Sequence, residues 1–357
     1  MNTNRRATLM DVAAAAGVSP STASRALSNA PMTRMSDATR QRVLAAAASL
    51  GFRANAQAQT LRSGSSMLIG VVVPDIAIAF YAAALKGAQK ALEAAGYQVL
   101  VMNTEREAEH EATALRTLYA RQVDGVLIAT SGGFVAGDVP VVFFDHVIGG
   151  TGLGYAAPDN EGGVMALVEH LVREHGHQRI GYVGAPSRPG PDVERLEYGP
   201  ANERLEAFRF AMGSLMLPVI PRYLVAGDYE WSEASAEQAV SELLALPDPP
   251  TAIVAAGDTL ALGALRAIRR AGLDVPGDIA LVSFDDPVSG DLLTPGMTTL
   301  GRHDRELGEL GARMLLDALS GGPSPAQPGA VRVPLELIVR GTCGCGHVTK
   351  TQESAVS

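Results

Sequence analysis

The 357-residue chain lacks several features that define large classes of protein. It has no uninterrupted apolar run of the roughly 18–20 residues that span a bilayer. Its first residues, MNTNRRATLMDV, are followed by neither an apolar segment nor a small-residue cleavage site, so we expect no signal peptide. The two cysteines, Cys343 and Cys345, are too close in sequence to join distant elements, which fits a reducing compartment without excluding an oxidising one. We therefore expect a cytoplasmic protein without membrane contact.

The sequence also lacks the residue patterns of common catalytic and cofactor sites. The apolar segment that begins at residue 68 runs into VVVPDIAIAFY, without the G-x-G-x-x-G turn that binds a dinucleotide pyrophosphate. The segment Cys343-Gly-Cys345-Gly-His347 offers three soft ligands, but structural zinc sites use four ligands at wider spacing. No nucleophile, base and acid stand at a helpful spacing. We expect no enzyme activity, no cofactor and no bound metal.

Lysine and glutamate are absent from residues 1–65, and this absence changes the meaning of the net charge of -9. That segment contains eight arginines against only Asp11 and Asp37, which gives +6. The remaining residues carry 21 basic and 36 acidic side chains, which gives -15. Such an asymmetry is typical of a small nucleic-acid-binding module attached to an acidic domain.

The basic segment is predicted to form three short helices. Thr8 and Asp11 have the spacing of a capping box, and Gly17 can end the helix that they start. Ser19 followed by Pro20 then provides an N-cap and a first residue for a second helix, so the turn between the two helices is short. A third helix is expected from Ser36 to Gly51. Its apolar face is formed by Val43, Leu44, Ala47 and Leu50. This order is that of a helix-turn-helix module.

From residue 67 onward, apolar strands alternate with helical stretches, which predicts an open α/β architecture. Buried parallel strands are expected at 68–74, 98–102, 125–129, 139–145, 180–184, 223–226, 252–255 and 279–284, with helices such as 81–95, 162–175 and 259–271 between them. Ligands of such folds bind beyond the carboxyl ends of the strands. Asp75, Asp145, Asp258 and Asp285 stand at these ends and are therefore candidates for ligand binding.

Several of these motifs together resemble the LacI/GalR family of bacterial regulators. The resemblance rests on TLMDVAAAAGVSPSTASRALSN and SDATRQRVLAAAASLGFRANAQAQTLRSGSSMLIGVVVPDI in the first quarter of the chain, and on DNEGG at 159–163, ERLEAF at 203–208 and SFDD at 283–286. It covers some 340 residues in family order. The implied fold is an all-α helix-turn-helix headpiece (1–53), a hinge helix and linker (54–66), a two-lobed periplasmic-binding-protein-like, Rossmann-like core (67–345) and a flexible tail (346–357).

The resemblance places the second headpiece helix in the major groove of operator DNA. Pro20, Ser21 and Arg25 match positions that face bases, and Arg25 can donate two hydrogen bonds to guanine O6 and N7. A contact of Arg25 with phosphate alone remains an alternative. The resemblance also implies that residues 55–61 form a helix with Leu61 as a minor-groove wedge beside Arg62. The remaining implied DNA contacts are Thr8, Ser19, Thr22, Ser24, Ser28, Asn29, Asn55 and Ala58; Ser19 is equally explained as a helix cap.

The resemblance further implies an effector site between the lobes, formed by Asp75, Phe80, Asp145, Arg204, Tyr229, Asp258 and Asp285. Carboxylates accept hydrogen bonds from hydroxyl pairs, Arg204 donates, and an aromatic ring covers the apolar face of a sugar. A dianion would need more cationic groups than Arg204, for which His146 and Arg188 are the obvious additions. A structural role for the aspartates, as helix caps or strand-end acceptors, remains the alternative.

We therefore expect a dimeric repressor that binds a pseudo-palindromic operator and responds to a small effector, most simply a sugar. A nucleobase, a nucleoside or another small metabolite remains an alternative effector. A sugar-binding protein without a role on DNA shares the core fold, but it needs an export signal and has no use for a basic helix-turn-helix.

Overall fold

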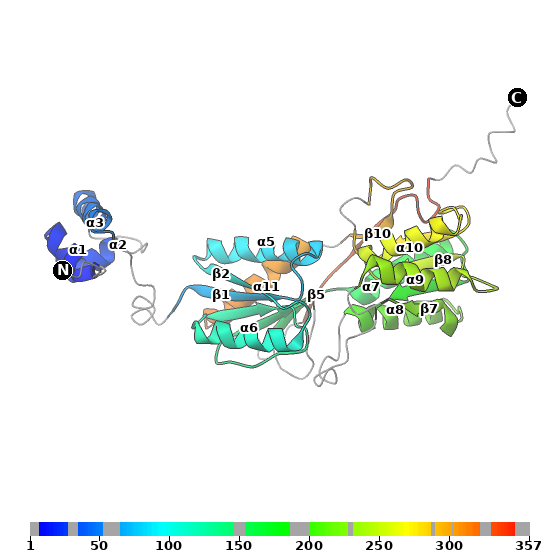
Figure 1. Cartoon of the computed structure of the whole chain (residues 1–357), viewed down its shortest axis with the longest axis horizontal. Helices are drawn as coiled ribbons and strands as arrows, with labels where there is room; N and C mark the ends of the chain where they lie inside the picture. The colour runs from blue at the N-terminus through cyan, green and yellow to red at the C-terminus, as the bar shows by residue number, and fades with distance from the viewer. Residues whose placement is uncertain are drawn as a thin grey trace, which may run out of the picture. The chain divides into compact units, whose positions relative to one another are not determined.

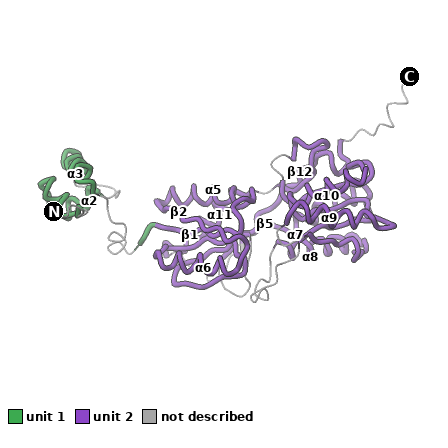
Figure 2. Tube along the Cα trace, viewed as in Figure 1, with its two compact units in different colours: residues 1–67 green, residues 68–357 purple. Residues whose placement is uncertain are grey.

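The computed structural model describes residues 7–27, 35–52, 65–145, 154–185, 200–227, 231–286, 290–301, 303–321 and 330–346. The chain divides into two compact units, Met1–Met67 and Leu68–Ser357 (Figures 1 and 2). The finer boundaries expected from the sequence, at the hinge and at the tail, stay predictions. None of the described helices is long and apolar enough to cross a membrane.

Unit 1 is built from the three helices α1 (Leu9–Ala16), α2 (Pro20–Leu27) and α3 (Asp37–Ser49). Thr8 and Asp11 form the expected capping box, and Gly17 closes α1 in the left-handed conformation at φ 63°. The side chain of Ser36 caps α3, as expected. A small core of alanines and valines, including Val12, Ala23 and Val43, holds the three helices together. Leu44 and Leu50, expected on the buried face of α3, are 37% and 41% exposed instead.

The first lobe of unit 2 is a six-stranded sheet in the order β11-β5-β4-β3-β1-β2. Its strands are β1 (Leu68–Val73), β2 (Gln98–Asn103), β3 (Gly125–Ile128), β4 (Val141–Phe144), β5 (Gly154–Pro158) and β11 (Ala330–Val333), and all pairs are parallel. The helices are α5 (Ala79–Ala94), α6 (Ala108–Ala120) and α11 (Asp304–Leu319). Alternate residues of β1 face opposite sides of the sheet, because Val71 packs with α5 and α11 and Val72 packs with α6. Figure 1 shows α5 and α6 on opposite sides of this sheet.

The second lobe repeats this plan in the order β12-β10-β9-β8-β6-β7. Its strands are β6 (Ile180–Gly184), β7 (Leu224–Ala226), β8 (Ala252–Ala255), β9 (Ala280–Ser283), β10 (Thr298–Gly301) and β12 (Glu336–Ile338). Its helices are α7 (Asn160–Arg173), α8 (Pro200–Ser214), α9 (Glu233–Leu244) and α10 (Asp258–Arg270), with a 3₁₀ turn at Pro221–Tyr223. Only β12 runs antiparallel to its neighbour, β10. One continuous apolar core joins these helices to the sheet.

The chain crosses between the lobes at three points, because each sheet contains strands from distant parts of the sequence. It passes from β5 to α7 at residues 158–160, from β10 to α11 at 301–304, and from β11 to β12 at 333–336. Asp159 N donates to Val333 O at 2.9 Å, so two of the crossings are hydrogen-bonded to each other. These crossings place several side chains of both lobes around one shared space.

The expected helix-turn-helix headpiece and two-lobed α/β core are confirmed, and eight of the strands lie where the sequence placed them. The expectation that all eight are buried is wrong for β2 and β7. Both are edge strands with half-exposed or exposed residues, because each has only one neighbour in its sheet. The sequence analysis also missed β5, β10, β11 and β12. All four adjoin the crossings, where pairing with distant segments of the chain fixes a strand without a local apolar run.

Two glycines allow α5 and α11 to pack backbone against backbone. A Cβ atom added at Gly308 would lie 1.9 Å from the carbonyl oxygen of Ala84, and one at Gly87 would lie 1.9 Å from that of Arg305. Both obstacles are main-chain atoms, which cannot move without separating the helices. The first lobe therefore depends on these two positions having no side chain.

We predict that Gly308→Ala lowers the free energy of unfolding by about 1–3 kcal/mol, because the methyl group forces α5 and α11 apart. Gly213→Ala in α8 is the matched control, since a Cβ there meets nothing within 4 Å. This control should gain up to about 1 kcal/mol, because alanine favours the helix more than glycine does. Thermal and urea unfolding of the two variants measures both effects. Equal stabilisation by both substitutions would show that α5 and α11 are not in close contact.

Candidate nucleic-acid interface and ligand cavity

The exposed face of α2 carries the residues that the sequence assigned to base contact. Pro20, Ser21 and Arg25 are all exposed, while Ala23 and Ala26 on the opposite face are buried in the headpiece core. The guanidinium of Arg25 donates from Nε to the carbonyl oxygen of Ser21 at 3.2 Å, which lays the side chain along its own helix. The helix thus presents a short polar strip with one cation to the solvent.

Two of the hydroxyls that the sequence assigned to DNA contact also have structural roles. The hydroxyl of Thr8 accepts from Asp11 N at 3.3 Å, and its oxygen lies 2.7 Å from Asp11 Oδ2. The hydroxyl of Ser19 accepts from Thr22 N at 3.2 Å. These bonds cap α1 and α2, and contacts of Thr8 and Ser19 with DNA stay predictions. Thr22 and Ser24 are half-buried on α2. Ser28, Asn29, Asn55, Ala58, Leu61 and Arg62 lie outside the described residues.

Unit 2 contains a cavity of about 260 Å³ between residues of its two lobes. The first lobe contributes the segment that starts α5, including Phe80, and the second contributes the ends of β8 and β9 through Asp258 and Asp285. The crossing from β10 to α11 closes one side. The full described lining is Ile78, Ala79, Phe80, Asp258, Asp285, Asp286, Gly301, His303, Asp304, Glu336 and Ile338. The volume is just below the range of about 300–1,000 Å³ usual for small-molecule sites.

The described lining is strongly acidic. It contains one imidazole, that of His303, and five carboxylates. The carboxylates belong to Asp258, Asp285, Asp286, Asp304 and Glu336. Asp286 has a close cationic partner, because Arg340 donates to its two oxygens at 2.6 and 2.9 Å, and Asp285 lies 3.5 Å from a guanidinium nitrogen of Arg204. Asp258 Oδ1 accepts from Thr259 N at 2.7 Å, at the start of α10. An anionic ligand would be repelled here, whereas hydroxyl groups and cations find hydrogen-bond acceptors.

Arg204 lies directly behind this lining and is only 3% exposed. Its Nε donates to Asn160 Oδ1 at 3.1 Å, and its Nη1 donates to Ala256 O at 2.6 Å. The same Nη1 lies 3.5 Å from Asp285 Oδ2. The guanidinium carbon is 3.5 Å from the ring centroid of Phe284, so the cation stacks on an aromatic face. Arg204 therefore fixes the carboxylate of Asp285 at the cavity wall.

Two further aromatic side chains adjoin Arg204. Trp231 lies with its ring centroid 6.0 Å from the guanidinium carbon, and a Cβ added at Gly257 would lie 3.2 Å from the indole. Burial raises the pKa of Tyr182, and the positive charge of Arg204 offsets this rise only in part, so the phenol stays neutral. Both side chains extend the apolar surface around the buried cation.

The predicted effector residues are brought together only in part. Phe80, Asp258 and Asp285 line the cavity, and Arg204 contacts Asp285 from behind. Asp75 and Asp145 are not among the described lining residues. The carboxylate of Asp75 accepts from Ala77 N at 2.9 Å, and that of Asp145 accepts from Tyr81 Oη at 3.0 Å. These contacts agree with the structural roles that the sequence left open for both aspartates. Tyr229 lies outside the described residues.

The sequence analysis missed several residues of this site. Asn160, Phe284 and Trp231 surround Arg204, and Asp286, His303 and Glu336 line the cavity. Of these residues, Trp231 had the clearest signal in the sequence, because it is the one tryptophan of the chain and follows the predicted Tyr229 by two residues. His303 and Glu336 belong to the crossings, whose residues the sequence analysis did not assign to the site.

Two family models match the chain. The model described as "Bacterial regulatory proteins, lacI family" matches residues 8–55, and the "Periplasmic binding protein-like domain" matches residues 168–343. The first match covers the described helices of unit 1, and the second covers most of the second lobe of unit 2.

Individual proteins match over nearly the whole chain. The HTH-type transcriptional repressor CytR of Escherichia coli (strain K12) is 31% identical over 343 residues, which are 94% of this chain and 96% of the relative. A crystal structure of the Lac repressor dimer bound to operator and the anti-inducer ONPF superimposes with a TM-score of 0.81 at 30% identity, covering 95% of this chain and 99% of that one. A complex of the transcriptional regulator CelR with cellobiose has a TM-score of 0.65 at 28% identity, covering 94% and 100%.

Proposed function

Because the chain belongs to the lacI family of bacterial regulatory proteins, it is a DNA-binding transcription repressor with an effector-binding core, and we propose that its effector is a neutral sugar. The observation that carries this proposal is the acidic cavity between the lobes, with its five carboxylates. Such acceptors suit the paired hydroxyls of a sugar ring, and Phe80 offers an apolar surface to one face of the ring. The cellobiose complex of CelR supports a sugar in a related core.

The charge of the cavity also argues against other effectors. A sugar phosphate would place a dianion beside Asp258, Asp285 and Glu336, with His303 as the one possible cation in the described lining. Arg204 is poorly placed to neutralise such a ligand, because it is 3% exposed, its Nη1 and Nε are already bonded to protein acceptors, and its face covers Phe284. A planar base would need stacking surfaces on both of its faces. The described lining contains one phenyl ring, that of Phe80.

We further propose that the protein binds a pseudo-palindromic operator as a homodimer, and that it acts in the cytoplasm by binding alone, without catalysis. The exposed strip on α2 spans one turn and a half of an eight-residue helix, too little surface for tight specific binding. Twofold symmetry doubles that surface. The Lac repressor, which superimposes on this chain, is a dimer on its operator. Leu61 is proposed as the minor-groove wedge, with Arg62 beside it.

Arg25 is predicted to read one base pair in each half-site. An operator would be selected from a random DNA library by the purified protein, and affinities for single-base variants measured by fluorescence anisotropy. Arg25→Ala should remove about 1–3 kcal/mol of discrimination at one position per half-site. Arg42→Ala removes an equally exposed arginine from α3 and should weaken all sequences alike. If Arg25→Ala also weakens all sequences alike, Arg25 contacts phosphate instead of a base.

A sugar that binds the cavity is predicted to change the fluorescence of Trp231, because the indole lies beside Arg204 and Trp231 is the one tryptophan of the chain. Sugars, amino sugars, nucleosides, purines and amino acids would be screened by thermal shift, since a ligand of the folded state raises the melting temperature. The hits would then be titrated by fluorescence and tested for release of the operator.

Arg204→Ala should abolish this response while operator binding persists, because Asp285 loses the cation that positions it. Arg209→Ala is the matched control, since Arg209 lies on the same helix, is 45% exposed and pairs with Glu206 at 2.5 Å. Asp258→Asn tests the cavity wall without removing a buried charge. A purine or an amino acid as the tightest ligand would refute the sugar, and a normal response of both site variants would refute the site.

A further inference from the structure

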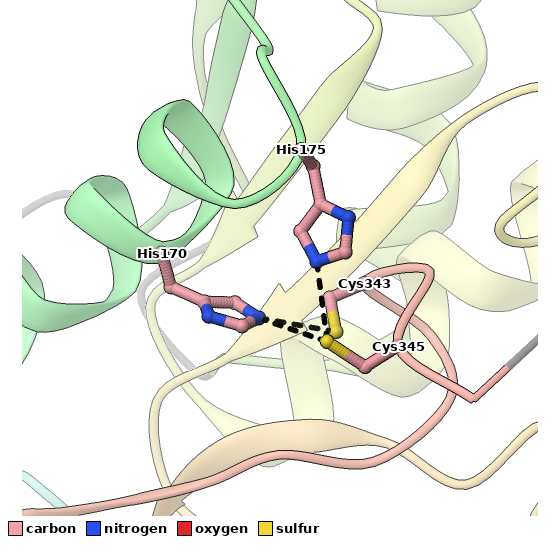
Figure 3. A group of neighbouring side chains, drawn as sticks. All are labelled: His170, His175, Cys343 and Cys345. Carbon is pink, nitrogen blue, oxygen red and sulfur yellow. Dashed lines mark hydrogen bonds between the residues drawn. The ribbon is translucent and has the colours of Figure 1, made fainter.

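Four side chains of types that can bind metals meet in the second lobe, two from each of two segments that are far apart in sequence (Figure 3). His170 lies in the last turn of α7, and His175 lies in the turn that follows this helix. Cys343 and Cys345 come from the C-terminal segment that follows β12. The sequence analysis considered only the two cysteines and His347, which lies outside the described residues, and therefore counted too few ligands.

The geometry of the cluster approaches that of a tetrahedral metal site. His170 Nε2 lies 3.3 Å from Cys343 Sγ and 3.7 Å from Cys345 Sγ, and His175 Nε2 lies 3.3 Å from Cys345 Sγ. One ligand atom from each residue lies within 4.8 Å of all the others. A zinc tetrahedron with metal–nitrogen distances of about 2.0–2.1 Å and metal–sulfur distances of about 2.3 Å has edges of about 3.3–3.8 Å. Three of the edges already have this length.

The main chain holds the two cysteines in place. Leu281 N donates to Thr342 O at 3.0 Å, which fastens the segment to β9, and Gly341 N donates to Gly296 O at 2.9 Å. Gly344 adopts φ 111°, a conformation open to glycine, and a Cβ there would lie 3.2 Å from Nδ1 of His175. The Cys-Gly-Cys turn can therefore direct both sulfur atoms toward the imidazoles.

A hydrogen bond from outside the cluster orients one of the sulfur atoms. Thr298 Oγ1 accepts from Arg340 N at 2.9 Å and lies 3.1 Å from Cys343 Sγ. Because the hydroxyl oxygen accepts from that amide, its own hydrogen is available to the sulfur. Cys343 is 1% exposed, so a thiolate formed there would gain from this donor. Outer contacts of this kind are a regular feature of metal sites in proteins.

We propose that His170, His175, Cys343 and Cys345 form a structural zinc site that joins the C-terminal segment to the end of α7. Two thiolates and two imidazoles are soft and intermediate ligands, which favour Zn²⁺ over Mg²⁺ or Ca²⁺. Four protein ligands fill a tetrahedral shell, so the ion has no open position for a substrate. The site adds a metal to the proposed repressor and does not depend on the identity of its effector.

The test uses the full-length chain, purified without a histidine tag and under reductant. Zinc is measured per chain by elemental analysis, and Co²⁺ is used as the spectroscopic probe. We expect one zinc per chain, and for Co²⁺ the visible bands of a tetrahedral ion with sulfur-to-metal charge transfer in the near ultraviolet. Added Zn²⁺ should remove these bands and raise the melting temperature of the metal-free protein.

Cys345→Ser and His175→Gln each remove one ligand at a half-buried position. Each should weaken metal binding by more than the roughly 10–100-fold that loss of an outer contact costs. His177→Gln is the matched control, because His177 lies two residues from His175 but its Nδ1 is 3.0 Å from Thr251 Oγ1. The control should keep the stoichiometry and the Co²⁺ spectrum of the unchanged protein.

Three results would overturn the proposal. The first is a reduced protein, with both thiols titratable, that binds no stoichiometric zinc. The second is a disulfide between Cys343 and Cys345 in protein purified under reductant. The third is an unchanged Co²⁺ spectrum in both ligand variants, which would place the bound metal elsewhere. Operator binding, measured on the same samples, separates each of these results from a failure of the repressor assignment.

Discussion

The three crossings of the chain between the two sheets are the constraint on which the core depends. In a parallel sheet all strands end at the same edge, and the segments that follow them carry the ligand-binding residues. Here the segments after β1, β8 and β9 contribute Phe80, Asp258 and Asp285 to one cavity, although they belong to different lobes. The crossing from β10 to α11 adds His303 and Asp304 to the same cavity. The connections that join the lobes therefore also line the cavity that we propose as the ligand site.

Arg204 provides the buried electrostatic anchor of that site. A cation that is 3% exposed would be costly without partners. Asn160 of α7, Ala256 after β8 and Asp285 after β9 supply acceptors, and Phe284 supplies an aromatic face. The side chain of Arg204 thus links α8 to α7 and to the segments that follow β8 and β9. The position of Asp285 in the cavity wall depends on this network, and for this reason we expect Arg204 to affect ligand binding although it lies outside the described lining.

Sequence reasoning reached the architecture but only part of the site, for identifiable physical reasons. Helix caps such as Thr8, Ser19 and Ser36 act over three residues, so local spacing predicts them, and the structure contains all three. The central strands, such as β1, β3 and β8, are continuous apolar runs. The strands β5, β11 and β12 are fixed by pairing with distant segments, for which a single sequence carries no local signal.

The same distinction between local and long-range signals explains which site residues the sequence predicted. Arg204 and Asp285 stand in the specific motifs ERLEAF and SFDD, whereas Trp231, His303 and Glu336 reach the site only through the tertiary fold. Asp75 and Asp145 stand at strand ends as expected, yet their carboxylates bond Ala77 and Tyr81. A strand end therefore predicts where an aspartate lies, but the surrounding backbone decides what its carboxylate contacts.

Helix α7 connects the effector network to the four-residue metal cluster. Its first residue, Asn160, accepts from Arg204, and His170 lies in its last turn beside Cys343. The helix has 14 residues, so its two ends lie about 20 Å apart along a rigid rod. A cation bound by His170 and His175 would fix the far end of this rod to the C-terminal segment, which is itself bonded to β9 through Leu281 and Thr342. Since β9 runs into Phe284 and Asp285, the cluster and the proposed effector site are fastened to the same two elements, at opposite ends of α7.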